Sequence, residues 1–155
     1  MLGAIIGDIV GSRFEFDANA EEGFELFTDD CDYTDDTICT VAIADAILNG
    51  KPYKDALLEW CRRYPNPKGA YGSMFSRWIN SAEAQPQSSF GNGSAMRVSS
   101  VGWLFHTYQE VQREAERSAM VSHCHSEGIK VPSVWPPSST GFARYASART
   151  NWSAP

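Results

Sequence analysis

The sequence predicts an all-α protein, and three kinds of observation support this expectation. Apolar residues recur at the 3.6-residue period of a helix in several segments up to residue 122. Capping residues, such as Thr34 and the pair Asn49-Gly50, stand at the ends of these segments. No run of alternating apolar and polar residues is long enough to predict a sheet. A chain of 155 residues has the length of one domain that can bury a sizeable core.

Composition and charge argue against several functions. The formal net charge of −6 gives no bulk attraction to nucleic acid. The apolar residues 1–7 have no basic flank and are too few to cross a bilayer, so we expect a cytoplasmic protein without membrane contact. The cysteines show no CxxC pair and no regular spacing, which predicts core or bystander thiols rather than a disulfide framework. They are Cys31, Cys39, Cys61 and Cys124.

The first predicted helix covers residues 2–11. Gly3, Gly7 and Gly11 are spaced four residues apart and would form a smooth stripe that another helix can approach closely. Isoleucines and a valine cover the other faces, which is typical of a central helix. Asp8 therefore needs a role, either accepting hydrogen bonds from neighbouring backbone groups or supporting metal ligands.

Glu15 follows this helix between Phe14 and Phe16. Aromatic surroundings raise the pKa of a carboxyl, as an acid–base group or a conditional metal ligand requires. The alternative is a surface glutamate flanked by two core phenylalanines. The acidic residues 17–32 then predict an exposed loop.

The stretch Tyr33-Thr34-Asp35-Asp36-Thr37 places two adjacent carboxylates in the first turn of a second helix. They would at least complement the helix dipole, which is worth about 0.3–1 kcal/mol for each acid. Three more aspartates stand just upstream, so five carboxylates fall within eight residues and a cation would relieve their repulsion. Thr34, Asp35 and Asp36 are therefore candidate metal ligands, and such oxygen ligands favour Mg²⁺ over zinc.

Four further helices are predicted before residue 122, separated by proline, glycine and polar residues. They cover residues 54–64, 73–80, 98–108 and 111–122. The sequence Pro65-Asn66-Pro67 ends the first of them, and residues 68–72 predict a flexible loop.

Two segments between or after these helices are candidates for ligand binding. In Phe90–Arg97, two glycines flank Asn92 before a helical run, which exposes backbone N–H groups and a positive helix end to phosphate. The spacing is neither GxGxxG nor a P-loop, so this pattern alone is weak. Farther on, His123 and His125 would diverge by about 200° on a helix, so that one meets a ligand or the core while the other is exposed.

Four motifs, taken in order, resemble those of the ADP-ribosylglycohydrolase family, which includes the dinitrogenase reductase activating glycohydrolases. They are Gly7-Asp8-x-x-Gly11-Ser12-x-x-Glu15, Tyr33-Thr34-Asp35-Asp36-Thr37, Phe90-Gly91-Asn92-Gly93-Ser94-Ala95-Met96-Arg97, and Ser122-His123 with Gly128. The resemblance covers residues 1–130, roughly the N-terminal half of a family domain. It implies an all-α orthogonal helical bundle with two Mg²⁺ (or Mn²⁺) ions in a cleft. The implied substrate is ADP-ribose joined to a protein side chain through an N- or O-glycosidic bond.

The resemblance also implies roles by position. Thr34, Asp35 and Asp36 would be metal ligands, and Glu15 would lie near the ribose and the metal as a catalytic carboxylate together with Asp35 and Asp36. The residues around the diphosphate and ribose would be Gly91, Asn92, Gly93, Ser94 and, close to the site, His123. Two cations would fix the hydroxyls of the distal ribose while a carboxylate and a metal-held water serve C1.

The chain departs from the family pattern after residue 130. Family members supply a second acidic cluster from their C-terminal half, but no Asp follows Asp55 here. Residues 131–155 contain no Asp, Glu or Lys and show no helical or strand period. We expect a frameshift or truncation near Lys130 that leaves an atypical tail, either frameshifted or disordered, and one half of a dinuclear site.

Two functions remain open from the sequence. One is a hydrolase that removes ADP-ribose from modified proteins, and the other is a non-catalytic ADP-ribose-binding or structural relative. A truncated bundle would leave apolar helix faces uncovered, so we also expect a homodimer.

Overall fold

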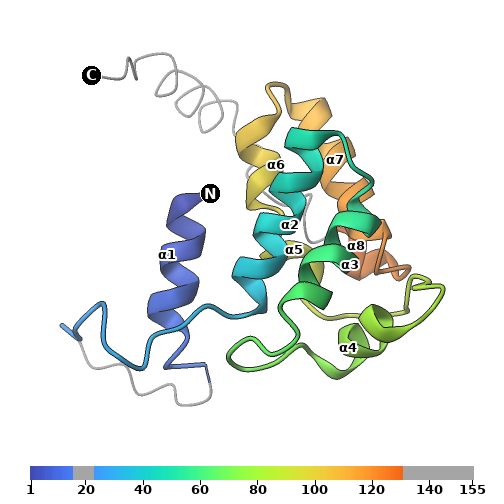
Figure 1. The fold of residues 1–155 in the computed structure, drawn as a ribbon. Helices are drawn as coiled ribbons and strands as arrows, with labels where there is room; N and C mark the ends of the chain where they lie inside the picture. Colours follow the sequence, from blue (N-terminus) through green and yellow to red (C-terminus); the bar gives the residue numbers. More distant parts are fainter. Residues whose placement is uncertain (16–22, 131–155) are drawn as a thin grey trace.

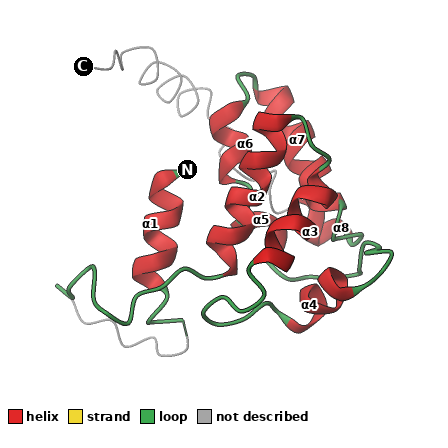
Figure 2. Cartoon of the chain, in the orientation of Figure 1, coloured by secondary structure: helices red, strands yellow, loops and turns green. Residues whose placement is uncertain are grey.

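The structure is a computed structural model that describes residues 1–15 and 23–130. These residues form eight helices joined by loops, and they contain no strand (Figures 1 and 2). In chain order the helices are α1 (Leu2–Gly11), α2 (Asp35–Asn49), α3 (Tyr53–Arg63), α4 (Ser73–Asn80), α5 (Gly93–Met96), α6 (Ser99–Leu104), α7 (Tyr108–Met120) and α8 (Ser126–Lys130). The all-α prediction is confirmed for these residues. The predicted tail, residues 131–155, lies outside them.

Helix α2 is the element on which the others pack. Thr34 caps it, because its side chain accepts a hydrogen bond from the Asp36 N–H at 3.2 Å. Gly50 ends it in the left-handed conformation, φ 64°, which glycine adopts without strain. Helices α1, α3, α5 and α6 all contact α2, and Figure 1 shows it between α1 and the rest of the bundle.

The hydrophobic core gathers around the inner faces of α2 and α3. Ile43, Leu57, Trp78 and Val101 are among its completely or almost completely buried side chains. Burying a side chain of this size stabilises the fold by about 1.5–3 kcal/mol. Cys39 and Cys61 also lie in this core with their sulfur atoms 3.9 Å apart, and all four cysteines of the chain are free. The expectation of unpaired thiols is therefore confirmed.

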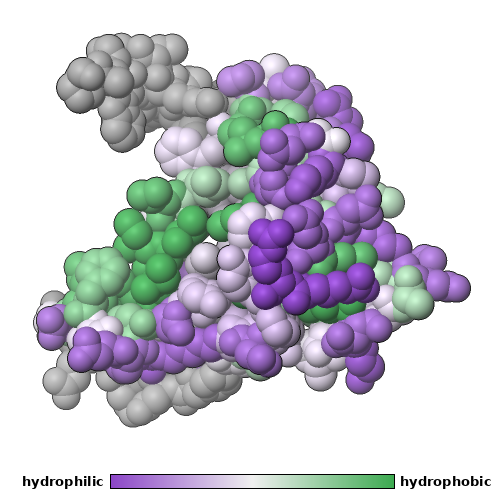
Figure 3. All heavy atoms as spheres, in the orientation of Figure 1, coloured by the Kyte–Doolittle hydropathy of each residue, from purple (hydrophilic) through white to green (hydrophobic). Residues whose placement is uncertain are grey.

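Helix α1 differs from the central helix that the sequence predicted. Its main contact is with α2, and among the described residues the stripe of Gly3, Gly7 and Gly11 has no atom within 4 Å of an added Cβ. Leu2 is 69 % exposed and Ile6 is 44 % exposed. Figure 3 shows the resulting hydrophobic surface over α1 in green. The prediction of a central helix is thus wrong for the described part of the chain, whereas the expectation of an uncovered apolar helix face is confirmed for α1.

The predicted helix boundaries between residues 98 and 122 were also wrong. Helix α6 ends at Leu104 and α7 begins at Tyr108, rather than at residues 108 and 111. The reason is a capping box, in which Thr107 accepts from the Glu110 N–H at 3.2 Å and Glu110 accepts from the Thr107 N–H at 3.0 Å. The predicted helices at 54–64 and 73–80 correspond to α3 and α4 within one residue at each end.

None of the helices in residues 1–15 and 23–130 combines the length and the hydropathy needed to span a bilayer.

Candidate functional site

Asp8 fixes the start of α2, where the predicted metal ligands lie. Its carboxylate accepts hydrogen bonds from the backbone N–H of Thr34 at 3.0 Å and of Thr37 at 3.2 Å. The hydroxyls of the same two threonines also donate to it. These bonds satisfy N–H groups that a helix leaves open at its N-terminus. Asp8 therefore accepts hydrogen bonds from nearby backbone, as one of its two predicted roles required, and it does so next to the candidate ligand Thr34.

The acids at the start of α2 repel one another. Burial, followed by the charges of Asp36 and Glu15, raises the pKa of Asp35 to about 6. Burial and the charges of Asp8 and Glu15 also raise the pKa of Asp36. In the part of the chain that the structure describes, no salt bridge involves any of these four carboxylates. The result is a concentration of negative charge without a cationic side chain to balance it.

Glu15 reaches this cluster across the loop between α3 and α4. A Cβ added at Gly69 would collide with the Glu15 carboxylate, so the two residues are in close contact. Gly69 has φ 78°, which also favours glycine. The Lys68 N–H donates to the Tyr33 carbonyl at 3.3 Å and holds this loop beside the start of α2. Glu15 itself is largely exposed, as the alternative of a surface glutamate predicted. That alternative did not predict its position beside the other acids.

The Phe90–Arg97 segment forms the other side of the site. Helix α5 begins here, and Ser94 is fully buried with its hydroxyl donating to the Gly128 carbonyl. The Gly91 N–H, which was predicted to be open to phosphate, donates instead to Ser89 Oγ at 3.1 Å. Neither Gly91 nor Gly93 has a positive φ. An added Cβ at Gly91 would lie 3.3 Å from Ser89 Oγ, and one at Gly93 would make ordinary contact with His123 Cε1 at 3.5 Å.

His123 is held against this segment by backbone pairing. The Gln87 N–H donates to the Ser122 carbonyl at 2.9 Å, and the Cys124 N–H donates to the Gln87 carbonyl at 2.9 Å. A Cβ at Gly128 would lie 2.9 Å from His123 Cδ2, so the glycine makes room for the imidazole. His123 is 5 % exposed, whereas His125 is half-buried and its ring centroid lies 4.0 Å from that of Phe90. The prediction that one histidine meets the core is confirmed for His123, but His125 is not exposed as predicted, and residues 122–125 are not helical.

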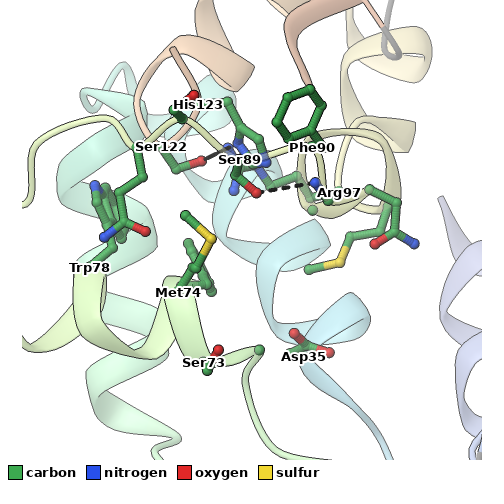
Figure 4. A pocket seen from close by; sticks show the side chains of 17 residues that line it. Asp35, Ser73, Met74, Trp78, Ser89, Phe90, Arg97, Ser122 and His123 are labelled. Atoms are coloured by element: carbon green, nitrogen blue, oxygen red, sulfur yellow. Dashed lines mark hydrogen bonds between the residues drawn. The ribbon is translucent and has the colours of Figure 1, made fainter. Parts of the chain in front are cut away.

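A pocket of about 480 Å³ joins these elements, and its volume is in the range of small-molecule sites. Of the predicted site residues, Asp35, Gly91, Asn92, Gly93 and His123 line it. In Figure 4, Asp35 and Ser73 lie toward one end, while His123, Ser122 and Phe90 lie toward the other. Thr34, Asp36, Glu15 and Ser94 do not line the pocket, and the first three adjoin it through Asp35.

Several lining residues were not named individually as site residues from the sequence, although Phe90, Met96 and Arg97 belong to the predicted ligand-binding segment. The lining residues that were not named are Gly72, Ser73, Met74, Phe75, Trp78, Gln87, Ser88, Ser89, Phe90, Met96, Arg97 and Ser122. Trp78 and Phe75 stack with centroids 5.3 Å apart and resemble ordinary core residues in sequence. For Arg97 the sequence offered one signal, its place at the end of the Phe90–Arg97 motif, whereas its full burial is unusual for an arginine.

The residues at the acidic end fit part of a hard-metal site. Two adjacent carboxylates and a threonine hydroxyl form an oxygen donor set of the kind that Mg²⁺ or Mn²⁺ accepts. Within residues 1–15 and 23–130, however, no group of three or more His, Cys, Asp or Glu side chains is arranged to hold a metal ion. These residues would therefore need further ligands to complete such a site.

Comparison with known proteins identifies the family of the chain. The sequence profile of the ADP-ribosylglycohydrolase family matches residues 1–135, and the chain belongs to that family. It is similar to ADP-ribosylhydrolase ARH3 of Mus musculus, with 26 % identity over 161 residues that cover 83 % of this chain and 44 % of the relative. The corresponding Homo sapiens protein is 26 % identical over 162 residues, with the same coverage, and that of Danio rerio is 25 % identical over 156 residues, which cover 83 % of this chain and 42 % of the relative. The chain thus spans less than half the length of the curated relatives it matches.

Proposed function

We propose that the pocket binds ADP-ribose and that the chain contributes to hydrolysis of the N- or O-glycosidic bond between ADP-ribose and a protein side chain. One observation carries this proposal: a single cavity brings together Asp35, the Phe90–Arg97 segment and His123, which come from three separate sequence motifs. Membership of the ADP-ribosylglycohydrolase family and the similarity to ADP-ribosylhydrolases give the same class of substrate.

The acidic end of the pocket would take the cation. Asp35 and Asp36, with the Thr34 hydroxyl, would hold Mg²⁺ or Mn²⁺ as half of a dinuclear site. When bound, such ions polarise substrate oxygens and lower the pKa of water. Asp8 would keep Thr34 and the α2 N-terminus in place, because its carboxylate already joins them. Glu15, beside Gly69, would orient the ribose or move a proton at its anomeric centre.

The other end of the pocket would take the diphosphate and the base. The structure shows no partner among the described residues for the N–H groups of Gly93 and Ser94. Arg97 adds a buried positive charge to the pocket wall. Phe90 lines the pocket and is 71 % exposed, so its ring offers a stacking surface to a nucleobase.

A non-catalytic ADP-ribose-binding role is the second candidate function. The observation that favours it is the incomplete set of acidic ligands within residues 1–15 and 23–130. Binding at the Phe90–Arg97 end does not depend on those ligands. Such a protein would bind ADP-ribose with little dependence on Mg²⁺ and would release none from a modified protein.

We also propose that the chain forms a homodimer through the exposed apolar face of α1. Leu2 and Ile6 lie on this face beside the open stripe of Gly3, Gly7 and Gly11, which allows close approach of a second helix. Light scattering at micromolar concentration should give a dimer, and Ile6→Glu should give a monomer. Met120→Glu, at a residue 50 % exposed on α7, is the matched control. A wild-type monomer would contradict this assembly.

Calorimetry and a release assay together test the proposed function. ADP-ribose should bind the wild-type chain, and it should bind more tightly when Mg²⁺ is present. Release of ADP-ribose from an ADP-ribosylated protein in the presence of Mg²⁺ would establish the hydrolase, whereas binding without release would favour the second candidate. If ADP-ribose does not bind under either condition, both functions are wrong.

A further inference from the structure

Arg97 is a buried cation whose charge is not balanced by an acid. It is completely buried and lines the pocket, and no carboxylate of the described residues pairs with it. Its Nη2 donates to the Ser118 carbonyl at 2.8 Å and to Ser122 Oγ at 2.7 Å. Its Nε and Nη1 have no hydrogen-bond partner in the structure. A buried charge with open donors is costly, so its place in this wall calls for a function.

Ser122 connects this cation to His123. Ser122 Oγ lies 2.7 Å from Arg97 Nη2 and 2.9 Å from His123 Nδ1. A guanidinium can only donate hydrogen bonds, so the serine oxygen must accept from Arg97. Ser122 is buried, and the structure shows no other acceptor for its hydroxyl hydrogen among the described residues. Donation to Nδ1 satisfies this hydrogen, whereas accepting a second bond from an Nδ1–H would leave it unpaired. In a neutral imidazole this arrangement places the ring proton on Nε2.

The other ring nitrogen is directed to the ligand-binding segment. An added Cβ at Gly93 would lie 3.8 Å from His123 Nε2, while Gly128 faces the Cδ2 edge of the ring. Burial and then the charge of Arg97 lower the pKa of His123, although the backbone of Gly91 and Ala119 acts in the opposite direction. Burial and the charge of Arg97 therefore favour the neutral ring. Only the neutral ring has two tautomers, because the charged ring carries a proton on both nitrogen atoms.

We propose that Arg97 and Ser122 are positioning residues that hold His123 as its Nε2-protonated tautomer, so that the ring donates a hydrogen bond to an anionic oxygen of the ligand. This inference rests on the proposed function for the identity of the ligand, ADP-ribose. The opposite tautomer would present a lone pair to the same oxygen and repel it. The relay therefore decides whether His123 attracts or repels a diphosphate.

The first test reads the tautomer in the ligand-free protein. In the chain labelled with ¹⁵N-histidine, NMR at neutral pH should show His123 Nδ1 unprotonated and Nε2 protonated. Ser122→Ala removes one hydroxyl and should abolish this preference, while far-UV circular dichroism should remain that of the wild type. Ser122→Thr retains the hydroxyl and should keep the tautomer. A proton on Nδ1 in the wild type, or an unchanged tautomer in Ser122→Ala, would overturn the relay.

The second test links the tautomer to binding. Ser122→Ala should weaken ADP-ribose binding about tenfold in calorimetry, which corresponds to roughly 1.4 kcal/mol. Gln at position 123 has an amide donor that needs no tautomer, so adding Ser122→Ala to His123→Gln should cause little further loss. Equal losses in both backgrounds would overturn the positioning role. A wild-type chain that binds no ADP-ribose would overturn the proposed function, whereas the tautomer measurement decides the relay independently of any ligand.

Discussion

The two ends of the pocket carry opposite charge, and at each end the charge lacks an oppositely charged side chain among the described residues. At one end Asp35 and Asp36 lie near Asp8 and Glu15, and burial together with the neighbouring negative charges raises the pKa of Asp35 to about 6. At the other end Arg97 is buried with two of its nitrogen atoms lacking partners. The acidic end is stabilised by binding a cation and the basic end by binding an anion. ADP-ribose bound together with a divalent cation would supply the anion for the basic end and the cation for the acidic end.

The ends also differ in how they are held. Asp8 anchors the acidic end with four hydrogen bonds from Thr34 and Thr37, so the first turn of α2 is fixed without a ligand. The basic end is a short helix and a loop, tied by the Ser94 hydroxyl, Gln87 and Ser122. Removing a charge at the first end should therefore change cation binding, while steric changes at the second should change the affinity for the ligand's phosphates.

The largest expected effect is the loss of cation binding. Asp35→Ala combined with Asp36→Ala should abolish the Mg²⁺-dependent response in calorimetry, because it removes both adjacent carboxylates. Far-UV circular dichroism should change little, since a first-turn acid contributes about 0.3–1 kcal/mol to a helix. Asp29→Ala with Asp32→Ala is the matched control, because these two acids are exposed and do not line the pocket. Unchanged Mg²⁺ affinity in the Asp35/Asp36 double variant would remove the basis for a metal site.

The next effect concerns stability. Asp8→Ala should lower the free energy of unfolding by about 2–3 kcal/mol, because it leaves the Thr34 and Thr37 donors without their acceptor. Urea unfolding followed by circular dichroism measures this loss. Asp8→Asn keeps one acceptor oxygen and should cost less than Asp8→Ala. Equal stability of Asp8→Ala and wild type would show that the α2 N-terminus does not depend on this anchor.

Part of the fold and site could be predicted from local sequence. The Thr34 cap, the Gly50 terminus and the acids in the first turn of α2 depend on neighbouring residues, and the structure places them as predicted. The Thr107–Glu110 capping box was also present in the sequence but was not recognised, which displaced two helix boundaries. These features need no knowledge of what packs against the helix.

Other features depend on contacts between distant segments. The bonds from Thr34 and Thr37 to Asp8 span 26 and 29 residues, and the contact of Glu15 with Gly69 joins α1's end to the loop before α4. Periodicity shows that α1 is apolar, but it does not show which faces are covered. Likewise, the burial of Arg97 follows from the packing of α5 against α7 and α8 and not from its neighbours in sequence.

A smaller effect should appear at the basic end. Gly93→Val should weaken ADP-ribose binding about tenfold, or roughly 1.4 kcal/mol, because its extra methyl groups would crowd His123, which already lies 3.5 Å from an added Cβ. Ribose, which has no phosphates, should lose less in the same calorimetric titration. Gly102→Val is the control, since an added Cβ at Gly102 has no described atom within 4 Å. Equal losses for ADP-ribose and ribose would place the diphosphate elsewhere.

The smallest effect is the destabilisation caused by the raised pKa of Asp35 at the acidic end. The pKa of Asp35 is raised to about 6 in the fold from an ordinary value of 3.8, so the folded chain holds a proton that the unfolded chain releases between these values. Stability should therefore fall as the pH rises from 4 to 6, and this contribution should be fully present below the ordinary pKa. Asp35→Asn should raise the free energy of unfolding at pH 7 by about 1 kcal/mol, allowing for the partial exposure of the carboxylate. Because other carboxylates titrate in the same range, the measurement is the difference between wild-type and variant urea midpoints across this window, with the exposed Asp29→Asn as the control. Parallel curves for wild type and Asp35→Asn would show that folding does not raise the pKa of Asp35, and the charge contrast between the two ends of the pocket would then lose its energetic basis.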